Sequence, residues 1–385
     1  MSNGLETDVD GIVERLNEAD GPDLVTAGAV LTIDLGAVRE NYRRLKTRLG
    51  STRCAGVVKA DGYGLGAAVI ARALQKEGCD SFFVANASEG IDLRAALGTG
   101  PAIHVLNGLP PGAEGEAAAA GLIPVANSTD QLAAWRATAR RLGRKLPVAV
   151  QVDSGMSRLG MPPVEVEAVA ADAEAFTGLD LVLVMSHLAC ADEPDHAANR
   201  AQLAAFERLR RLLPAAPASL ANSSGIFLGP EWHFDLARPG AALYGINPTP
   251  DVDNPMHPVV RLEAKVIQTR TIGAGVGIGY GHTAIADSPL RVATISLGYA
   301  DGWRRRAAAF AHFKDVRLPF IGRVSMDSII LDVSDLPEGG LEAGDMVEMI
   351  GPSQTLDEVA RYSGTIAYEV LTSLGHRFHR RYLGT

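Results

Sequence analysis

The sequence predicts an α/β protein in which a (β/α)8 TIM-like barrel precedes a mostly β C-terminal domain. Between residues 53 and 245, short apolar runs alternate with amphipathic helical patterns, as expected for parallel strands and their crossover helices. Polar residues follow many of these runs, and active sites of such barrels lie at the carboxyl ends of the strands. After about residue 256, strand-like runs are separated by Gly, Pro and Asp turns. An open doubly wound sheet is the alternative for the first part.

Three segments are expected along the chain. Residues 1–26 form an N-terminal extension, in which one short amphipathic helix ends at a Gly-Pro pair. Residues 27–255 form the barrel, except that the strand at 29–34 is expected to join the C-terminal domain. Residues 256–385 form the β-rich domain.

The barrel prediction depends on eight apolar runs and the helical patterns between them. The strands are expected at residues 53–58, 82–85, 102–106, 122–126, 147–152, 180–186, 217–221 and 241–245. The clearest helical patterns cover residues 67–78, 87–97, 128–142 and 194–213. In the β-rich domain the strand-like runs cover residues 260–272, 291–297, 316–320, 327–332 and 345–350.

Composition narrows the class of protein. Hydrophobic residues make up 47% and charged residues 21% of the 385, as in an ordinary globular protein. The net charge of −9, without a basic block, argues against a nucleic-acid partner. The three cysteines form no CxxC pair, no apolar stretch is long enough to span a membrane, and the N-terminus is acidic and polar. We expect a cytoplasmic enzyme.

The most informative stretch is VVKADGYGLG, residues 57–66. Lys59 follows a buried strand, where desolvation disfavours the charged ammonium and leaves a nucleophilic amine. Such an amine can form a Schiff base with a carbonyl compound. The glycines that follow let the backbone approach a bulky ligand closely, and the hydroxyl of Tyr63 could bind a phosphate oxygen.

Further polar residues follow the later strands. Arg158 can present a fixed fork of donors to a carboxylate or phenolate oxygen. His187 is expected to be oriented towards other polar groups at its strand end. Asn222 and Ser223 precede a helical pattern and fit both a phosphate site and an ordinary N-cap. Arg238 borders the expected eighth strand.

Two other kinds of site are not expected. His187, Cys190, Asp192 and His196 match no standard zinc spacing, so we expect no metal. The glycine-rich string GIGYGHT around Tyr280 satisfies GxGxxG in no register and precedes no long helix. A dinucleotide site is therefore unsupported.

Taken together, these strings resemble the motifs of the alanine racemases. VVKADGYGLG is similar to their lysine motif VVKANAYGHG, and the other strings follow in the family's order across nearly the whole chain except residues 1–26. They are VDSGMSRLG (152–160), SHLACAD (186–192), ANSSG (221–225), RPGAALYG (238–245), GIGYGHT (277–283), GYADG (298–302), GRVSMD (322–327) and TIAYE (365–369).

The resemblance implies pyridoxal 5'-phosphate as the cofactor, bound to Lys59, with Lys59 and Tyr280 as the catalytic residues. The implied cofactor-binding residues are Lys59, Tyr63, Arg158, His187, Asn222, Ser223, Arg238, Gly240, Ala241 and Tyr368. The implied substrate-binding residues are Arg158, Met326, Tyr280 and Tyr299.

The sequence departs from the family pattern near two of these residues. Gly62 and Leu65 replace an alanine and a histidine after the lysine. Gln151 stands where many members carry a carbamylated lysine that braces the arginine matching Arg158. Gln151 itself or a bound anion is expected to take over that role.

The resemblance also implies a mechanism. Lys59 removes the Cα proton of the D-substrate and Tyr280 that of the L-substrate, on opposite faces. Arg238 would contact the pyridine nitrogen and keep it unprotonated, which weakens the cofactor as an electron sink and limits side reactions. Because the tyrosine matching Tyr280 comes from the other subunit, a homodimer with shared active sites is expected.

The expected activity is the interconversion of L-alanine and D-alanine, with D-alanine serving as a peptidoglycan precursor. Three alternatives stay open from the residues: a racemase of broader or different specificity such as serine, a non-catalytic carrier of the same cofactor, and a decarboxylase. The carrier would lack the β domain, and the decarboxylase would place a carboxylate where Arg238 stands. Biosynthetic and catabolic roles are not distinguished.

Overall fold

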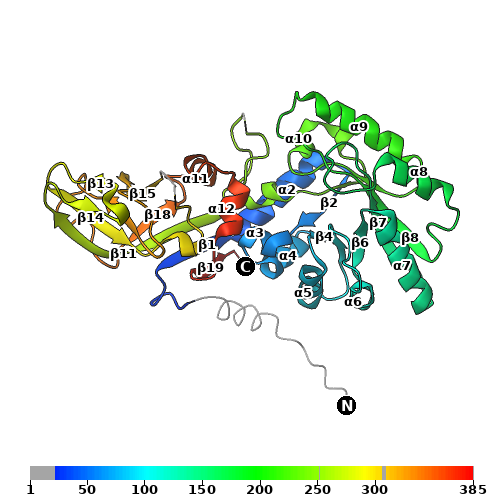
Figure 1. The fold of residues 1–385 in the computed structure, drawn as a ribbon, viewed down its shortest axis with the longest axis horizontal. Coiled ribbons are helices and arrows are strands. Elements are labelled where there is room, and N and C mark those ends of the chain that lie inside the picture. Colours follow the sequence, from blue (N-terminus) through cyan, green and yellow to red (C-terminus); the bar gives the residue numbers. More distant parts are fainter. Residues whose placement is uncertain (1–21, 251, 306–308, 385) are drawn as a thin grey trace, which may run out of the picture. The chain divides into compact units, whose positions relative to one another are not determined.

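The computed structural model describes residues 22–250, 252–305 and 309–384 (Figure 1). The helix expected within residues 1–21 lies outside these ranges. The chain forms two compact units. The barrel unit comprises Ala37–His257, and the β unit comprises the residues up to Gly36 together with Pro258–Thr385.

The barrel unit is built on a seven-stranded parallel sheet with strictly sequential order, which differs from the reversed order of a doubly wound sheet. Its strands are β3 (Gly56–Val57), β4 (Ser81–Val84), β5 (Ala102–Val105), β6 (Ile123–Ala126), β7 (Leu146–Gln151), β8 (Leu179–Met185) and β9 (Ala218–Ser219). The predicted fold class is confirmed.

Helices surround these strands (Figure 1). They are α2 (Leu35–Leu49), α3 (Lys59–Gly64), α4 (Ala67–Lys76), α5 (Ala87–Leu97), α6 (Glu114–Ala119), α7 (Thr129–Leu142), α8 (Pro163–Ala171), α9 (Ala197–Arg210) and α10 (Gly225–Leu228), with the 3-10 turns η1 (Pro230–Trp232) and η2 (Ala241–Tyr244). Because helices cover the sheet, its strands are apolar along their length, and every residue of β4 (SFFV) is buried.

The eighth strand position differs from the prediction. The strand β10 (Leu236–Ala237) pairs with β2 (Arg53–Cys54), and residues 241–245, expected as a strand, form η2 instead. The amide of Arg238 donates to the carbonyl of Ala221, and the amide of Ala55 donates to that of Ala237. These bonds join the last strands to the first, so β10 completes the ring.

The β unit contains an eight-stranded sheet in which the N-terminal strand β1 (Ala29–Asp34) pairs antiparallel with β11 (Val260–Ile272) and parallel with β19 (His379–Leu383). The other strands of the sheet are β14 (Leu290–Ile295), β15 (Phe310–Phe313), β16 (Val316–Pro319), β17 (Ile329–Asp332) and β18 (Met346–Ile350). The β unit also contains a two-stranded ribbon, two short turns and two helices. They are β12 (Gly277–Ile278) with β13 (Ala284–Ile285), η3 (Tyr280–His282), η4 (Tyr299–Asp301), α11 (Leu356–Tyr362) and α12 (Ala367–Ser373).

The sequence analysis missed β15 and β19 in this unit. Both strands are short, and β19 carries three charged or polar residues in five, HRRYL, so no apolar run marks it. Within the described ranges, no helix is both long enough and apolar enough to cross a membrane.

Candidate functional site

Lys59 stands on an unusual turn at the carboxyl end of β3. The next four residues, Ala60 to Tyr63, all have left-handed backbone angles, with φ between 52° and 62°. Three of them carry side chains, and this conformation costs a non-glycine residue roughly 1–2 kcal/mol. The surrounding structure must therefore hold the turn. Gly62 is the one residue that adopts it without this cost, and a Cβ there would meet the backbone of Ala67 at 3.1 Å.

Hydrogen bonds hold this turn at both ends. The amide of Gly62 donates to the carbonyl of Val58 at 2.9 Å, and the side chain of Asp61 accepts the amide of Ala67 at 2.8 Å. The carboxylate of Glu89 on α5 accepts the amide of Ala60 at 2.9 Å. The position of Lys59 is thus fixed by groups on three different elements.

The amine of Lys59 is electrostatically prepared for nucleophilic chemistry. Burial lowers its pKa, the positive charge of Arg158 lowers it further, and the carboxylate of Glu89 opposes both effects. A lowered pKa leaves more of the neutral amine at physiological pH.

A small polar corner lies beside the turn. The buried hydroxyl of Ser223 accepts the amide of Gly240 at 3.0 Å and that of Ala242 at 3.2 Å. Because both lone pairs of the hydroxyl oxygen are used, its proton is available for an acceptor such as a phosphate oxygen. A Cβ at Gly240 would overlap the hydroxyl of Tyr63, so glycine is required for the tyrosine to reach this corner.

Stacking holds Tyr63 in place. Its ring lies on that of Tyr244 with centroids 4.5 Å apart, and the Tyr244 hydroxyl donates to the carbonyl of Val57 at 2.9 Å. The side-chain oxygen of Asn222 accepts the amide of Gly225 at 2.8 Å, so Asn222 caps the turn that follows. The helix that follows, α10, is a single turn, so the expected contribution of a helix N-terminus is small; Ala241 begins η2 next to Gly240.

Arg238 is 4% exposed and lies at the end of β10. Its guanidinium donates to the hydroxyl of Ser219 and, at 2.6 Å, to the carbonyl of Ser186. Among the described residues it forms no ion pair with a carboxylate. Burial therefore lowers its pKa to about 9. A buried cation whose protein partners are neutral is complementary to a ligand with acceptor atoms.

His187 follows β8 and completes a basic cluster. Burial, together with the positive charges of Arg238, Arg158 and Lys59, lowers its pKa to about 3. The imidazole is therefore neutral at physiological pH. The structure thus brings together Lys59, Arg158, His187 and Arg238 around one centre in the barrel unit. A cluster of this composition favours a multiply charged anion over a cation.

The exposed Arg158 lies on a loop that Asp153 shapes. One oxygen of the Asp153 carboxylate accepts the amides of Gly155, Met156 and Ser157 at 2.9, 3.0 and 3.1 Å. Gln151 is buried beneath this loop, with its Cγ atom 3.2 Å from the position a Cβ would take at Gly160.

The sequence analysis missed Gln202, a buried residue of α9 that connects the loops of the site. Its amide nitrogen donates to the carbonyl of His187 at 2.9 Å and to Ser154, and its oxygen accepts the amide of Ala189 at 2.8 Å. The Ser154 hydroxyl in turn lies 2.7 Å from that of Ser186.

A signal for Gln202 was present in the sequence. Gln202, Phe206 and Leu209 occupy one buried stripe of α9 at helical spacing. Asn199 belongs to the same stripe, and amides among apolar residues on one helical face indicate buried hydrogen-bonding roles.

The remaining predicted residues lie in the β unit, whereas Lys59 lies in the barrel unit. Tyr280, Tyr299, Met326 and Tyr368 are 65%, 41%, 52% and 38% exposed. Their backbone segments are neighbours: the amide of Tyr299 donates to the carbonyl of Ser325, and a Cβ at Gly302, directly after η4, would overlap the carbonyl of Ser373 at the end of α12. A Cβ at Gly322 would lie 3.1 Å from the carbonyl of Ile278, which precedes Tyr280 by two residues.

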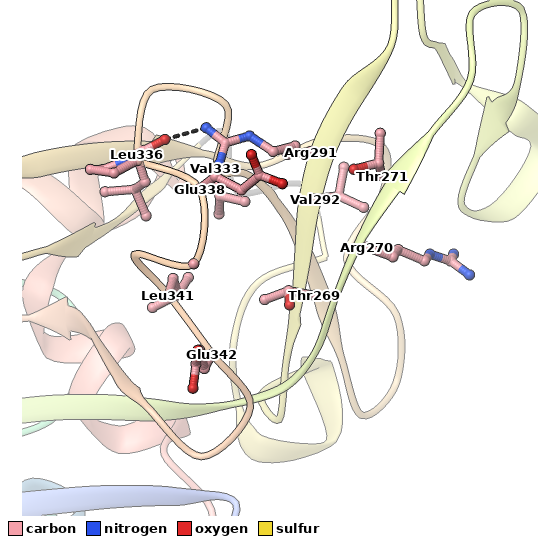
Figure 2. Close-up of a pocket in the computed structure, with 12 residues that line it drawn as sticks. Thr269, Arg270, Thr271, Arg291, Val292, Val333, Leu336, Glu338, Leu341 and Glu342 are labelled. Carbon is pink, nitrogen blue, oxygen red and sulfur yellow. Dashed lines mark hydrogen bonds between the residues drawn. The ribbon is translucent and has the colours of Figure 1, made fainter.

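Two further observations concern other kinds of site. Among the described residues, no group of three or more His, Cys, Asp or Glu side chains could hold a metal ion. Figure 2 shows a pocket of the β unit in which Arg291 donates to the carbonyl of Leu336. None of the described residues that line it belongs to the candidate site, and Arg291 is already bonded to protein carbonyls.

The fold and the site define a class of protein: an α/β-barrel protein with a partly buried lysine amine in a basic centre. Comparison with known proteins gives the family. The description "Alanine racemase, N-terminal domain" matches residues 33–248, and "Alanine racemase, C-terminal domain" matches residues 259–382. The chain belongs to the alanine racemase family.

Individual relatives are similar over almost their whole length. A protein of Mesorhizobium japonicum named "Alanine racemase, catabolic" is 69% identical over 358 residues, 93% of this chain and 94% of its own. An alanine racemase of Brucella canis is 49% identical over 376 residues, with 93% and 94% covered. The crystal structure of alanine racemase from Bartonella henselae with covalently bound pyridoxal phosphate has a TM-score of 0.90 at 43% identity, with 93% of this chain and 100% of that chain covered.

Proposed function

We propose that this protein is a pyridoxal-phosphate-dependent amino-acid racemase that interconverts L-alanine and D-alanine. The observation that carries the proposal is the amine of Lys59, with its lowered pKa, in the basic cluster that also contains Arg158, His187 and Arg238. Membership of the alanine racemase family and the covalently bound pyridoxal phosphate in the Bartonella relative support the choice of cofactor.

The residues fit this cofactor in three ways. The Lys59 amine can bond to its aldehyde, and the corner of Tyr63, Ser223 and Gly240 offers hydroxyl donors for its phosphate. The buried Arg238 offers a cation with neutral protein partners for its ring. When bound, the cofactor withdraws electrons from the substrate and so acidifies the Cα–H bond.

The chain supplies the proton transfers. With the cofactor and substrate bound, the Lys59 amine would accept or return the Cα proton on one face, as expected for D-alanine. Tyr280 does so on the other face, as expected for L-alanine. Arg158 holds the substrate carboxylate, and Tyr299 and Met326 limit the size of the substrate side chain. Asn222, His187, Ala241 and Tyr368 complete the proposed cofactor contacts.

We also propose a homodimer in which the β unit of one copy completes the site of the other. The support is that Tyr280, Tyr299 and Met326 are exposed in the single chain. Exposed aromatic and apolar side chains of this size typically mark an interface. A catalytic tyrosine also gains from exclusion of water, which a second chain would provide.

We place the enzyme in the cytoplasm, where the D-alanine that it forms serves as a peptidoglycan precursor. Because racemisation is reversible, the same site also supports alanine breakdown, and the Mesorhizobium relative is named for that role. Gene deletion separates the two uses. A requirement for D-alanine supports the biosynthetic role, whereas loss of growth on D-alanine as the carbon source supports the catabolic one.

The direct test is to add pyridoxal 5'-phosphate to the purified protein, record its visible absorbance, and follow the optical rotation of L-alanine and then of L-serine. A visible band together with decay of the L-alanine rotation to zero is the expected result. Faster decay with L-serine would mean that serine, rather than alanine, is the preferred substrate. A visible band without racemisation of either amino acid would overturn the proposal in favour of a carrier or another reaction.

A further inference from the structure

Glu89 connects the Lys59 turn to the neighbouring strand. It lies in the first turn of α5, half-buried, and uses its two carboxylate oxygens on different segments. Oε1 accepts the amide of Ala60 at 2.9 Å, while Oε2 accepts the amides of Ala85 at 2.7 Å and Asn86 at 3.3 Å.

The bond to Ala60 is made where the left-handed turn begins. Ala60 is the first of the four left-handed residues, and its amide is the peptide group shared with Lys59. A displacement of that peptide group moves the Cα atom of Lys59 and hence the whole side chain. The bonds to Ala85 and Asn86 fix the carboxylate to the end of β4, next to β3 in the sheet.

We propose that Glu89 is a positioning residue for Lys59: its carboxylate fixes the Lys59–Ala60 peptide group to the end of β4 and thereby aims the lysine amine. This inference rests on the proposed function for the role of Lys59. The bonds of Glu89 to its own helix alone would make it an ordinary helix cap. The bond to Ala60, which lies on another element directly after Lys59, distinguishes Glu89 from an ordinary helix cap.

The charge of Glu89 acts in the same place. The charged or titratable groups that face Lys59 are Arg158 on the loop after β7, His187 after β8 and Glu89 on α5. Burial and Arg158 lower the pKa of Lys59, His187 is neutral, and Glu89 raises it. Removal of the Glu89 charge therefore lowers the pKa of the amine.

The test is Glu89→Gln, with Glu165→Gln as the matched control. A glutamine has one acceptor oxygen and a donor NH2 group, so it can serve either Ala60 or the end of β4 and must face the other amide with a donor. Glu165 is a half-buried carboxylate in the first turn of α8 that accepts the amide of Thr129 across two elements at 2.8 Å. It makes the same kind of bond away from Lys59.

Three readouts are measured on the full-length holoenzyme. In Glu89→Gln we expect faster amide hydrogen exchange in residues 58–66 and a loss of kcat of about 10- to 100-fold, because the amine is misplaced. We also expect the acid limb of the kcat–pH profile with D-alanine as substrate to move to lower pH, since a base of lower pKa stays deprotonated at lower pH. Glu165→Gln should leave all three as in the wild type.

Equal exchange in residues 58–66 for Glu89→Gln and Glu165→Gln would overturn the inference, as would an unshifted acid limb with wild-type kcat. Failure of the proposed function is a separate result. If the wild type binds no pyridoxal phosphate and racemises nothing, the exchange measurement still decides whether Glu89 holds the Lys59 turn.

Discussion

The two units present their functional side chains in opposite ways. In the barrel unit, Ser223 and Arg238 are buried and each is bonded to two or more protein groups, so their geometry is set before any ligand arrives. In the β unit, Tyr280 is 65% exposed on a short turn between two-residue strands. Under the proposed function, the barrel unit therefore holds a preorganised half-site, and the β unit holds exposed residues whose environment a second chain would supply.

Loss of Lys59 is the most severe test of the preorganised half. In Lys59→Ala the amine that binds the cofactor and accepts a proton is absent, so we expect no visible band and a loss of kcat of roughly 100- to 10,000-fold. Absorbance spectroscopy and polarimetry measure the two effects. A visible band that persists in this variant would remove Lys59 from the site.

Tyr280→Phe tests the exposed half. Net racemisation cannot report the direction of the defect, because an equilibrium constant of one requires equal kcat/KM from either enantiomer. Exchange of the Cα hydrogen in D2O does report it. We expect exchange from L-alanine to fall about 100-fold, with exchange from D-alanine retained. Equal exchange from both enantiomers would contradict the assignment of Tyr280 as the second base.

Mixed dimers of the two variants show which chain completes the site. If Tyr280 acts on the partner's cofactor, a random mixture of Lys59→Ala and Tyr280→Phe chains contains one intact site in half of the dimers. About a quarter of the wild-type activity should then appear, although each variant alone is inactive. If Tyr280 acted within its own chain, the mixture would stay inactive.

Gln202→Leu tests whether the hydrogen bonds of Gln202 on α9 hold the loops of the half-site in position. The variant leaves the carbonyl of His187 and the amide of Ala189 without their side-chain partner. We therefore expect the free energy of unfolding to fall by about 2–3 kcal/mol. We also expect kcat to fall about tenfold, because the loop that carries His187 loses its support. The control is Gln131→Leu, whose side chain bridges Asn127 and Asn107 elsewhere in the barrel. A fall in stability without a greater fall in kcat than in the control would contradict the positioning role.

The sequence predicted the strand ends well because the chemistry there depends on residue type and local order. Lys59, Arg158, His187 and Arg238 follow β3, β7, β8 and β10, and the carboxyl ends of the strands of a barrel meet on one face. The eighth strand was misplaced because residues 241–245 are apolar and buried, and a short buried run does not distinguish a strand from a turn of helix. Glu89 escaped notice because its partner, Ala60, is a backbone amide 29 residues away in the sequence.

The smallest effect concerns acid stability and separates a buried from an exposed histidine. His104 on β5 stacks on Phe83, and burial lowers its pKa to about 3, with the charges of Arg53 and Arg238 adding to the effect. The unfolded chain takes up a proton near pH 6.5, whereas the folded chain does so only near pH 3. The free energy of unfolding therefore falls as the pH drops from 6.5 towards 3.

His104→Phe removes that difference while keeping an aromatic ring against Phe83. We expect the variant to be about 2–3 kcal/mol more stable than the wild type at pH 4.5, after allowance for any difference between them at pH 7.5. Urea unfolding of the full chain at both pH values measures it. The control is His282→Phe, the same substitution at an exposed position of the β unit. If His104→Phe kept the wild-type pH dependence, proton uptake at this buried site would play no part in acid unfolding, and the contrast between the two histidines would be lost.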